Sequence, residues 1–166
     1  MSYLDELFGL SGEVAVVIGG TGALGGAIAQ GLAQAGATVA VAGQGRDRGA
    51  ALVEAIRSQG GRAEYFAVDV SERASIEQLL AAVIARFRQV DMLVNCAGVN
   101  AASSYLQATD DEWEHVLRIN LSATHWGCQV FGGWMAESGR GGAILNIGSV
   151  TADKPLSRVF AYSVSK

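Results

Sequence analysis

Proline, charged residues and long apolar runs are all scarce in this chain of 166 residues. A single proline beside 22 glycines excludes a proline-rich linker, and a hydrophobic share of 50% excludes a disordered chain. Only 17% of the residues are charged and the net charge is −4, so the clustered lysines and arginines of a nucleic-acid surface are missing. No apolar run approaches the ~20 residues that span a bilayer. We therefore expect one soluble, cytoplasmic domain over residues 1–166, with no nucleic-acid or membrane partner.

Cysteine is rare as well, and neither Cys96 nor Cys128 has the spacing of a disulfide framework or a metal site. Both lie inside apolar runs, so we predict two buried free thiols and no bound metal. Residues 1–12 carry acidic side chains and no basic region that leads into a long apolar stretch. This segment therefore predicts no secretory signal.

Short β-branched runs alternate with longer amphipathic segments, which is typical of a parallel sheet covered by helices. We predict strands over residues 14–18, 38–42, 63–68, 92–95 and 143–147. The predicted helices cover 23–35, 46–58, a segment capped by Ser71, a long segment from Asp110 to Glu137, and a last one from near Ser157 to Lys166. Strict alternation predicts an α/β fold with a doubly wound, Rossmann-like parallel sheet, which binds ligands at the carboxyl ends of its strands.

Where the first predicted strand becomes the first helix lies a glycine-rich segment, Gly19-Gly20-Thr21-Gly22-Ala23-Leu24-Gly25-Gly26. Glycine there lets the backbone approach a pyrophosphate, whose charge is favoured by the free N–H groups and the positive dipole end of the helix. A tight loop without a ligand is the alternative for such a turn taken alone. The pattern G-x-G-x-x-G can be forced onto Gly20, Gly22 and Gly25. The spacing G-x-x-x-[GA]-x-G is met by Gly19, Ala23 and Gly25.

This second spacing resembles the short-chain dehydrogenase/reductase family, whose usual sequence there is T-G-x-x-x-G-x-G. Ile18 stands where threonine is usual, and Ala23 where the middle glycine is usual. Cys96 similarly replaces the second asparagine of the family's N-N-A-G. The marks of the family follow in order along residues 11–166: Asp69-Val70, Asn95-Cys96-Ala97-Gly98, Asn120, Ser149, and Tyr162-Ser163-Val164-Ser165-Lys166, which matches Y-x-x-x-K.

The resemblance implies an NAD(P)-dependent oxidoreductase that moves a hydride between nicotinamide and a ketone or secondary alcohol. It implies Tyr162 as general acid and base, with Lys166 favouring its phenolate and holding the nicotinamide ribose. A free tyrosine, with a pKa of about 10, needs such a neighbouring cation, and residues four apart share a helix face. Ser149 would hydrogen-bond the substrate oxygen, and Asn120 would hold a water that links Lys166 to solvent.

Taken singly, each of these residues also has an alternative without a catalytic role, and a tyrosine four positions before a lysine is commonplace. Asp69 could cap a helix, Asn120 could satisfy backbone groups, and Ser149 could cap a loop. The resemblance assigns Asp69 and Val70 to the adenine ring instead. We predict the following cofactor-binding residues: Gly19, Thr21, Ala23, Leu24, Gly25, Gln44, Arg46, Asp69, Val70, Asn95, Ala97, Gly98, Tyr162 and Lys166.

The choice of nicotinamide cofactor usually depends on the residues just after the second strand. Here the segment is Gly43-Gln44-Gly45-Arg46, without the acid that would bind the ribose hydroxyls of NAD. Arg46 and Arg48 lie close by, so we predict NADP rather than NAD. A solvated helix start is the alternative interpretation of these arginines.

The substrate is less well defined by the sequence. Residues 153–160 resemble members that act on sugar acids or polyols, with a 3-oxoacyl reductase as the alternative. An alternative of another class is a nucleotide-binding or interaction protein that keeps the fold without turnover. The resemblance also implies seven strands, so that two would follow Lys166 in a complete member. It further implies a homo-oligomer, a dimer or tetramer, built on residues 120–134 and the last helix.

Overall fold

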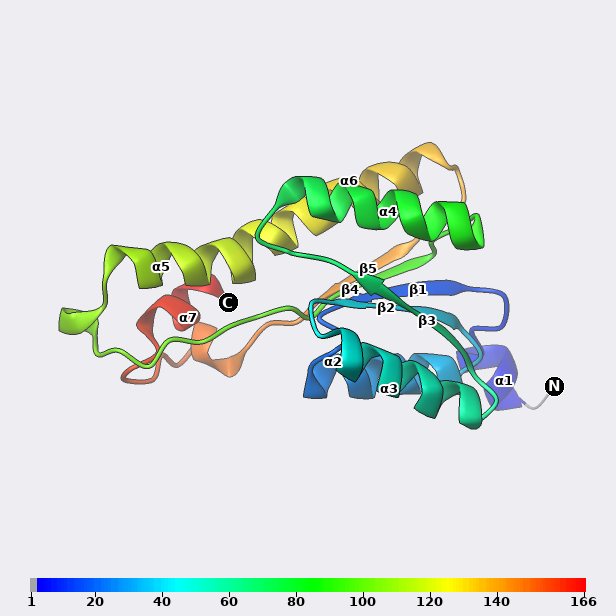
Figure 1. The fold of residues 1–166 in the computed structure, drawn as a ribbon, viewed down its shortest axis with the longest axis horizontal. Coiled ribbons are helices and arrows are strands. Elements are labelled where there is room, and N and C mark those ends of the chain that lie inside the picture. The colour runs from blue at the N-terminus through cyan, green and yellow to red at the C-terminus, as the bar shows by residue number, and fades with distance from the viewer. Residues whose placement is uncertain (1–2) are drawn as a thin grey trace.

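The computed structural model describes residues 3–166, except the side chains of Leu4 and Asp5. Met1 and Ser2, part of the segment for which we predict no secretory signal, lie outside the described residues. One parallel sheet in the order β3-β2-β1-β4-β5 forms the centre of the fold (Figure 1). Its strands are β1 (Val14–Ile18), β2 (Thr38–Gly43), β3 (Arg62–Ala67), β4 (Met92–Asn95) and β5 (Ala143–Asn146). The doubly wound α/β fold is therefore confirmed.

Helices cover both faces of this sheet. On one side lie α2 (Ala23–Gln34) and α3 (Arg46–Ser58), and on the other α4 (Arg73–Phe87) and α6 (Ala123–Glu137) (Figure 1). Alternate residues of β1 enter two separate cores: Val16 packs with the α4 and α6 side, and Val17 with the α2 and α3 side. Because both faces are buried, the strand is an unbroken apolar run rather than an alternating one.

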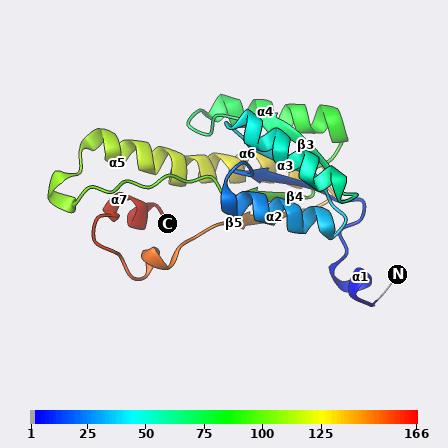
Figure 2. The ribbon, with the colours of Figure 1, turned by 60° about the horizontal axis from the view of Figure 1, so that its bottom comes forward.

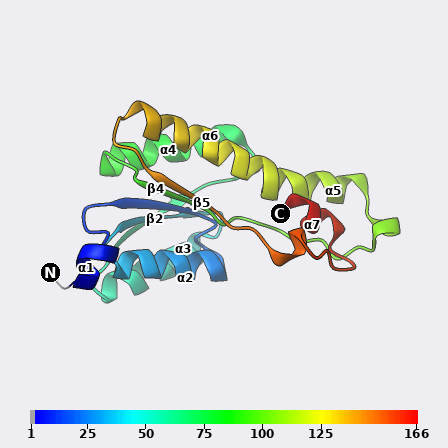
Figure 3. The ribbon, with the colours of Figure 1, turned by 180° about the vertical axis from the view of Figure 1, so that it is seen from behind.

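A second group of elements projects beyond the sheet. It consists of the short 3-10 helices η1 (Tyr105–Gln107) and η3 (Val150–Ala152), together with α5 (Asp110–Leu117) and α7 (Phe160–Ser165). In Figures 2 and 3, α7 lies beside α5, where the ring of Phe160 stacks on Trp113 with centroids 5.6 Å apart. The remaining helix, α1 (Tyr3–Phe8), lies at the N-terminal end of the described chain. No helix within residues 3–166 is long and apolar enough to cross a membrane.

The predicted long helix from Asp110 to Glu137 is present, but a π-helical turn, η2 (Arg118–Ser122), interrupts it. Thr109 caps its first turn, because the Thr109 hydroxyl accepts a hydrogen bond from the N–H of Glu112 at 3.2 Å. Asn120 lies at the centre of the π turn. Such turns carry one residue more than an α-helical turn and occur often at functional sites.

Three local predictions are wrong. Ser71 does not cap α4, which begins at Arg73; the Ser71 hydroxyl donates to Asp69 Oδ1 at 2.7 Å instead. The last helix begins at Phe160 rather than near Ser157, because Arg158 has a left-handed φ of 67° that a right-handed helix excludes.

The prediction of buried thiols is the third error. Cys96 and Cys128 are both free, but each is only half-buried. Cys96 follows β4 at the carboxyl edge of the sheet, where the layers open into a cleft. Cys128 lies on α6 near Asn146 of β5, and β5 is exposed along its whole length. An apolar sequence neighbourhood therefore did not ensure burial at either position.

At the opposite edge of the sheet, Asp91 ties three segments together. Its carboxylate accepts hydrogen bonds from the N–H of Val14 at 2.8 Å and from Gln89 Nε2 at 2.8 Å, and it forms an ion pair with Arg140 at 3.3 Å. Burial and the nearby charge of Asp91 raise the pKa of Glu13, which lies beside this carboxylate. Asp91 therefore joins β1, the turn before β4 and the segment before β5 through polar and charged contacts.

Candidate active site

A cleft of about 620 Å³ opens at the carboxyl ends of β1 to β4. This is the edge at which a doubly wound sheet binds its ligand. Among the predicted cofactor-binding residues, seven line it: Gly19, Thr21, Gln44, Asp69, Val70, Ala97 and Gly98. The other seven predicted residues are not among those that line it: Ala23, Leu24, Gly25, Arg46, Asn95, Tyr162 and Lys166.

The glycine turn after β1 packs directly on the loop after β4. Gly19 has a φ of 86°, and a Cβ atom there would lie 2.5 Å from the backbone nitrogen of Ala97. A Cβ on Gly25 would clash with the carbonyl oxygen of Gly19. Gly19 therefore allows the two loops to meet, and Gly25 allows α2 to pack on the glycine turn; a side chain at either position would prevent this.

The start of α2 offers a donor set that fits a phosphate group. Gly22 is its N-cap, and within the described chain no side chain caps the first turn. The leading N–H groups of such a helix need acceptors and carry the positive end of the helix dipole. A pyrophosphate of a dinucleotide supplies both the acceptors and the negative charge.

The side of the cleft that follows β3 carries an ionised carboxylate, that of Asp69. Asp69 Oδ1 accepts hydrogen bonds from the Ser71 hydroxyl at 2.7 Å and from the Ser71 N–H at 2.9 Å. These bonds, with a further one from Gln44, lower the pKa of Asp69. Asp69 therefore stays a charged acceptor at the cleft, and it does not cap α4, whose N-cap is Glu72.

Arg48, rather than Arg46, lines the cleft beyond β2. The two side chains leave α3 two residues apart, so they point in different directions around the helix. The guanidinium of Arg48 lies next to Gly45, where an added Cβ would be 3.0 Å from its Nε atom. The sequence indicates both arginines as candidates, and Arg46, which is the predicted cofactor-binding residue, does not line the cleft.

Two further lining residues, His115 and Ile119, were missed by the sequence analysis. They lie four positions apart on the helix that leads into Asn120, and residues at this spacing share a face. They lie five and one positions before Asn120, whereas α-helical spacing measured back from Asn120 gives Val116 and Leu117, so no local pattern identifies them.

Asn120 is buried, with 3% of its surface exposed, and its amide joins the loop after β4 to α7. Its Nδ2 donates to the carbonyl oxygen of Val99 at 2.9 Å and to Ser165 Oγ at 2.8 Å. Its Oδ1 accepts from the N–H of Val99 at 2.8 Å. Asn120 thus satisfies backbone groups, as its structural alternative predicted, and it does so next to the cleft.

Lys166 approaches the same end of the cleft from α7. Its ammonium donates to the carbonyl oxygen of Ile147 at 3.0 Å and lies 5.7 Å from the ring centroid of Tyr162. A Cβ on Gly98 would lie 3.5 Å from Asn120 Oδ1 and 3.6 Å from Lys166 Nζ. Gly98, Asn120 and Lys166 are therefore brought together from three distant segments. Burial raises the pKa of the nearby Cys96 thiol, and the charge of Lys166 opposes this shift.

Ser149 follows β5 and caps η3. Its Oγ accepts hydrogen bonds from the Thr151 N–H at 3.2 Å and the Thr151 hydroxyl at 2.9 Å. Because both of these bonds are accepted, the proton of the Ser149 hydroxyl is left for another acceptor. The capping alternative is therefore correct for Ser149, and it leaves a donor available.

Asn95, in contrast, faces away from the cleft. Its Nδ2 donates to Asn146 Oδ1 at 2.8 Å, which links β4 to β5. A side chain on Gly127 of α6 would clash with this pair, since a Cβ there would lie 2.5 Å from Asn95 Oδ1. In this structure the Asn95 side chain holds the sheet together.

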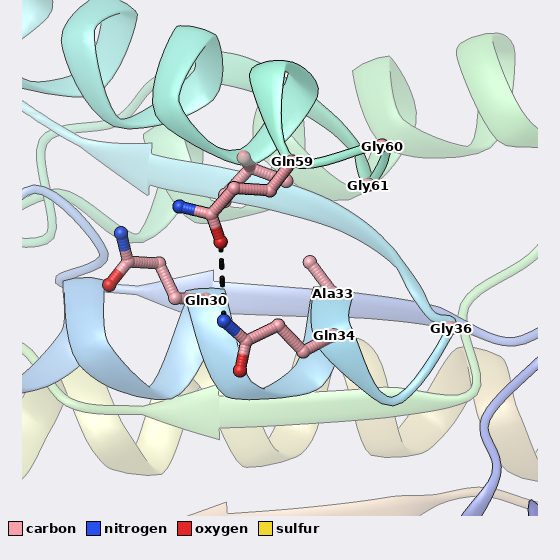
Figure 4. A pocket seen from close by; sticks show the side chains of 8 residues that line it. Gln30, Ala33, Gln34, Gly36, Gln59, Gly60 and Gly61 are labelled. Atoms are coloured by element: carbon pink, nitrogen blue, oxygen red, sulfur yellow. Dashed lines mark hydrogen bonds between the residues drawn. The ribbon is translucent and has the colours of Figure 1, made fainter.

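A second hollow, of about 470 Å³, lies at the opposite edge of the sheet between the C-terminal ends of α2 and α3 (Figure 4). Gln34 donates to Gln59 across it at 3.2 Å. Its lining residues are all uncharged: Gln30, Ala33, Gln34, Gly36, Ile56, Gln59, Gly60 and Gly61. It meets none of the motif residues, so the cleft at the carboxyl edge is the candidate active site.

Comparison with known proteins finds relatives along nearly the whole of this chain. The short chain dehydrogenase family profile matches residues 13–166. A D-threitol dehydrogenase of Mycolicibacterium smegmatis is 38% identical over 163 residues, covering 98% of this chain and 62% of that protein. A 3beta-hydroxysteroid dehydrogenase of Mediterraneibacter gnavus is 34% identical over 155 residues, covering 93% of this chain and 55% of that protein.

A solved structure is similar over nearly all of this chain. The gluconate 5-dehydrogenase of Burkholderia cenocepacia, in complex with NADP and tartrate, gives a TM-score of 0.91 at 28% sequence identity. The match covers 99% of this chain and 64% of that chain. The chain therefore spans less than two thirds of the length of each of these three relatives.

Proposed function

Since the chain belongs to the short chain dehydrogenase family, we propose that it forms the cofactor site and proton-transfer groups of an oxidoreductase that interconverts a ketone and a secondary alcohol. The observation that carries the proposal is the convergence of Gly98, Asn120 and Lys166 at one end of a cleft that begins at the glycine turn. A scaffold that only bound a nucleotide would not need a buried amide and an ammonium at that end.

NAD(P) fits the groups that line and surround this cleft. The glycine turn and the start of α2 would hold the pyrophosphate, and Asp69 with Val70 would hold the adenine ring. Lys166 and Tyr162 would hold the nicotinamide ribose. When bound, the nicotinamide ring accepts or donates the hydride, and the remaining proton is left to the protein.

We assign that proton to Tyr162. In the oxidation of an alcohol, the C–H electron pair leaves as hydride and the O–H proton passes to the Tyr162 oxygen; reduction reverses both transfers. Lys166, fixed by the Ile147 carbonyl, places its positive charge beside the phenol and stabilises the phenolate. Ser149 donates its free proton to the substrate oxygen as negative charge develops there.

Asn120 has less freedom in this scheme than the family resemblance suggests. Both of its amide protons and one oxygen lone pair are already engaged. Asn120 Oδ1 and Lys166 Nζ both lie next to Gly98, at 3.5 and 3.6 Å from a Cβ built there. A water that links Lys166 to solvent would bind there.

We favour NADP over NAD because Arg48 lines the cleft next to Gly45, and the lining residues after β2 include no acid. A guanidinium pairs well with the extra phosphate of NADP. Arg48→Ala should lower the affinity for NADPH by about tenfold or more and leave that for NADH within about twofold. Arg46→Ala is the matched control, and equal losses in the two variants would contradict the assignment.

The substrate class that we favour is a polyol or sugar acid, because relatives include a D-threitol dehydrogenase and a gluconate 5-dehydrogenase. The test is NADPH consumption by the protein at its full natural length with a panel of polyol-derived ketones, keto sugar acids, 3-oxoacyl thioesters and ketosteroids. Tyr162→Phe should abolish turnover and retain cofactor binding. Unchanged turnover in that variant would refute the mechanism, and cofactor binding without any turnover would favour a non-catalytic protein.

We also propose a homo-oligomer, on the basis of exposed apolar side chains on the helices beyond the sheet. Leu121 of η2 is 51% exposed and Val164 of α7 is 52% exposed. Apolar surface of this kind is typical of an interface. Size-exclusion chromatography with light scattering gives the subunit count.

A further inference from the structure

The hydroxyl of Ser165 lies between two groups that matter for the proposed chemistry. Ser165 is the last residue of α7 and only 6% exposed. Its Oγ accepts a hydrogen bond from Asn120 Nδ2 at 2.8 Å and donates one to the carbonyl oxygen of Tyr162 at 2.7 Å. The hydroxyl therefore connects Asn120 in the π turn to the backbone of Tyr162, the proposed proton-transfer residue.

Asn120 extends this connection to the cleft. Its amide holds both backbone groups of Val99, the N–H at 2.8 Å and the carbonyl at 2.9 Å. Val99 lines the cleft directly after Ala97 and Gly98. A continuous set of hydrogen bonds thus runs from the cofactor side of the cleft through Asn120 and Ser165 to Tyr162.

We propose that Ser165 is a positioning residue, whose hydroxyl fixes α7, and with it Tyr162 and Lys166, relative to the loop at Val99 that lines the cofactor cleft. The proposal rests on the proposed function for its catalytic consequence, but the structural link itself does not depend on turnover. Ser165 need not touch the substrate or the cofactor, so it acts through Tyr162 and Asn120.

Removing this hydroxyl leaves one proton of the Asn120 amide without an acceptor in a buried site. A buried donor without a partner is unfavourable, so Asn120 should reorient or weaken its hold on Val99. Asn120 and Ser165 each accept one hydrogen bond and donate another, and hydrogen bonds in such a series strengthen one another. Proton transfer needs its groups within hydrogen-bond reach, so small displacements of α7 should slow it.

The same helix contains a matched control. Ser163 is 7% exposed, yet its Oγ has no hydrogen-bond partner within residues 3–166. Ser163→Ala removes the same atoms from a similarly buried site of α7 without breaking a bond. Any difference between Ser165→Ala and Ser163→Ala therefore reports the hydrogen bonds of Ser165.

The first measurement is independent of activity. Amide hydrogen exchange is followed in wild type, Ser165→Ala and Ser163→Ala, at the Val99 N–H and across residues 97–100. Ser165→Ala should speed exchange at Val99 by about tenfold, because its acceptor Asn120 is no longer held, whereas Ser163→Ala should match wild type. Unchanged exchange at Val99 in Ser165→Ala would overturn the proposal even if the protein proved to have no turnover.

The second measurement uses turnover with the ketone that gives the highest rate. Ser165→Ala should lower kcat by about tenfold, leave the KM of the ketone within about twofold, and shift the pH–rate profile, whereas Ser163→Ala should change none of these. If Ser165→Ala does not fold, the near-isosteric pair Ser165→Thr and Ser165→Val replaces it, and only the threonine should retain kcat. Equal kcat in that pair, or in the two alanine variants, would overturn the proposal. Loss of the proposed function is seen separately, as unchanged turnover in Tyr162→Phe.

Discussion

Replacing Gly19 by alanine should strongly destabilise the protein, and the same substitution at Gly31 should stabilise it. Gly19 has a φ of 86°, and an added Cβ would lie 2.5 Å from the backbone nitrogen of Ala97. A left-handed backbone costs an L-residue about 1–2 kcal/mol, and forcing a methyl group against fixed atoms costs about 1–3 kcal/mol more. We therefore expect a loss of about 2–5 kcal/mol in the free energy of unfolding for Gly19→Ala.

Gly31 is the matched control because it lies on α2, which directly follows the turn. Nothing lies within 4 Å of a Cβ built on Gly31, and it is an interior residue of the helix. Alanine there should raise the free energy of unfolding by roughly 0.5–1 kcal/mol, because glycine loses more backbone freedom on folding.

Urea unfolding followed by circular dichroism measures both variants against wild type. The midpoints should move in opposite directions, with comparable slopes. A Gly19→Ala variant as stable as Gly31→Ala would refute the close packing between the turn and the loop after β4. It would also weaken the assignment of that turn to a phosphate group, since Gly19 and Ala97 both line the cleft.

Three further predictions concern the cleft and the charged groups at the two edges of the sheet. Gly98→Ala should fold normally, because the added Cβ makes only ordinary contacts at 3.5 and 3.6 Å. It should weaken NADPH binding by about tenfold in a fluorescence titration, and unchanged affinity would mean that the nicotinamide does not bind beside Gly98. Burial and Asp91 raise the pKa of Glu13 above 4.5, so the stability that Glu13 contributes is fully present below that pH and is lost as pH rises through the folded-state pKa. Glu13→Gln should not show this loss when urea midpoints are compared between pH 4 and pH 7. Hydrogen bonds from Ser71 and Gln44 lower the pKa of Asp69 below 3.8, so the stability that Asp69 contributes is present above that pH and is lost as pH falls through the folded-state pKa. Asp69→Asn should therefore lose less stability on acidification than wild type, and identical acid transitions would contradict these hydrogen bonds.

The sequence predicted those parts of the fold whose signals are local. The strand Val14–Ile18 is an apolar run followed at once by a glycine turn, and its bounds in the structure match the prediction. The start of the last helix was misplaced because Arg158 adopts a left-handed φ, which no residue type at that position indicates. The sequence predicted Ser71 as a helix cap, but α4 begins at Arg73, and the Ser71 hydroxyl donates to Asp69 Oδ1.

The sequence indicated which residue types form the site, but it did not indicate which residues they contact. The spacing of Tyr162 and Lys166 indicates a shared helix face, and the structure places the ammonium of Lys166 near the Tyr162 ring. The partners of Asn120, in contrast, are Val99 and Ser165, which lie 21 and 45 positions away in the sequence. Contacts at such separations depend on the packing of whole elements, so no local pattern predicts them. The prediction of Arg46 rather than Arg48 has a similar cause, since the rotation of α3 about its axis determines which of the two side chains reaches the cleft.

The π turn at Arg118–Ser122 has a consequence for how this helix can vary. The π turn already holds one residue more than an α-helical turn, so removing one residue from it would leave a regular helix with α5 and α6 still in phase. An α-helix advances by about 100° with each residue, so removing Val116 or Leu117 from α5 instead would rotate the residues before it by that angle. Trp113 would then leave Phe160, and His115 would leave the cleft. The π turn is therefore the place in this helix where the loss of a single codon disturbs the flanking contacts least.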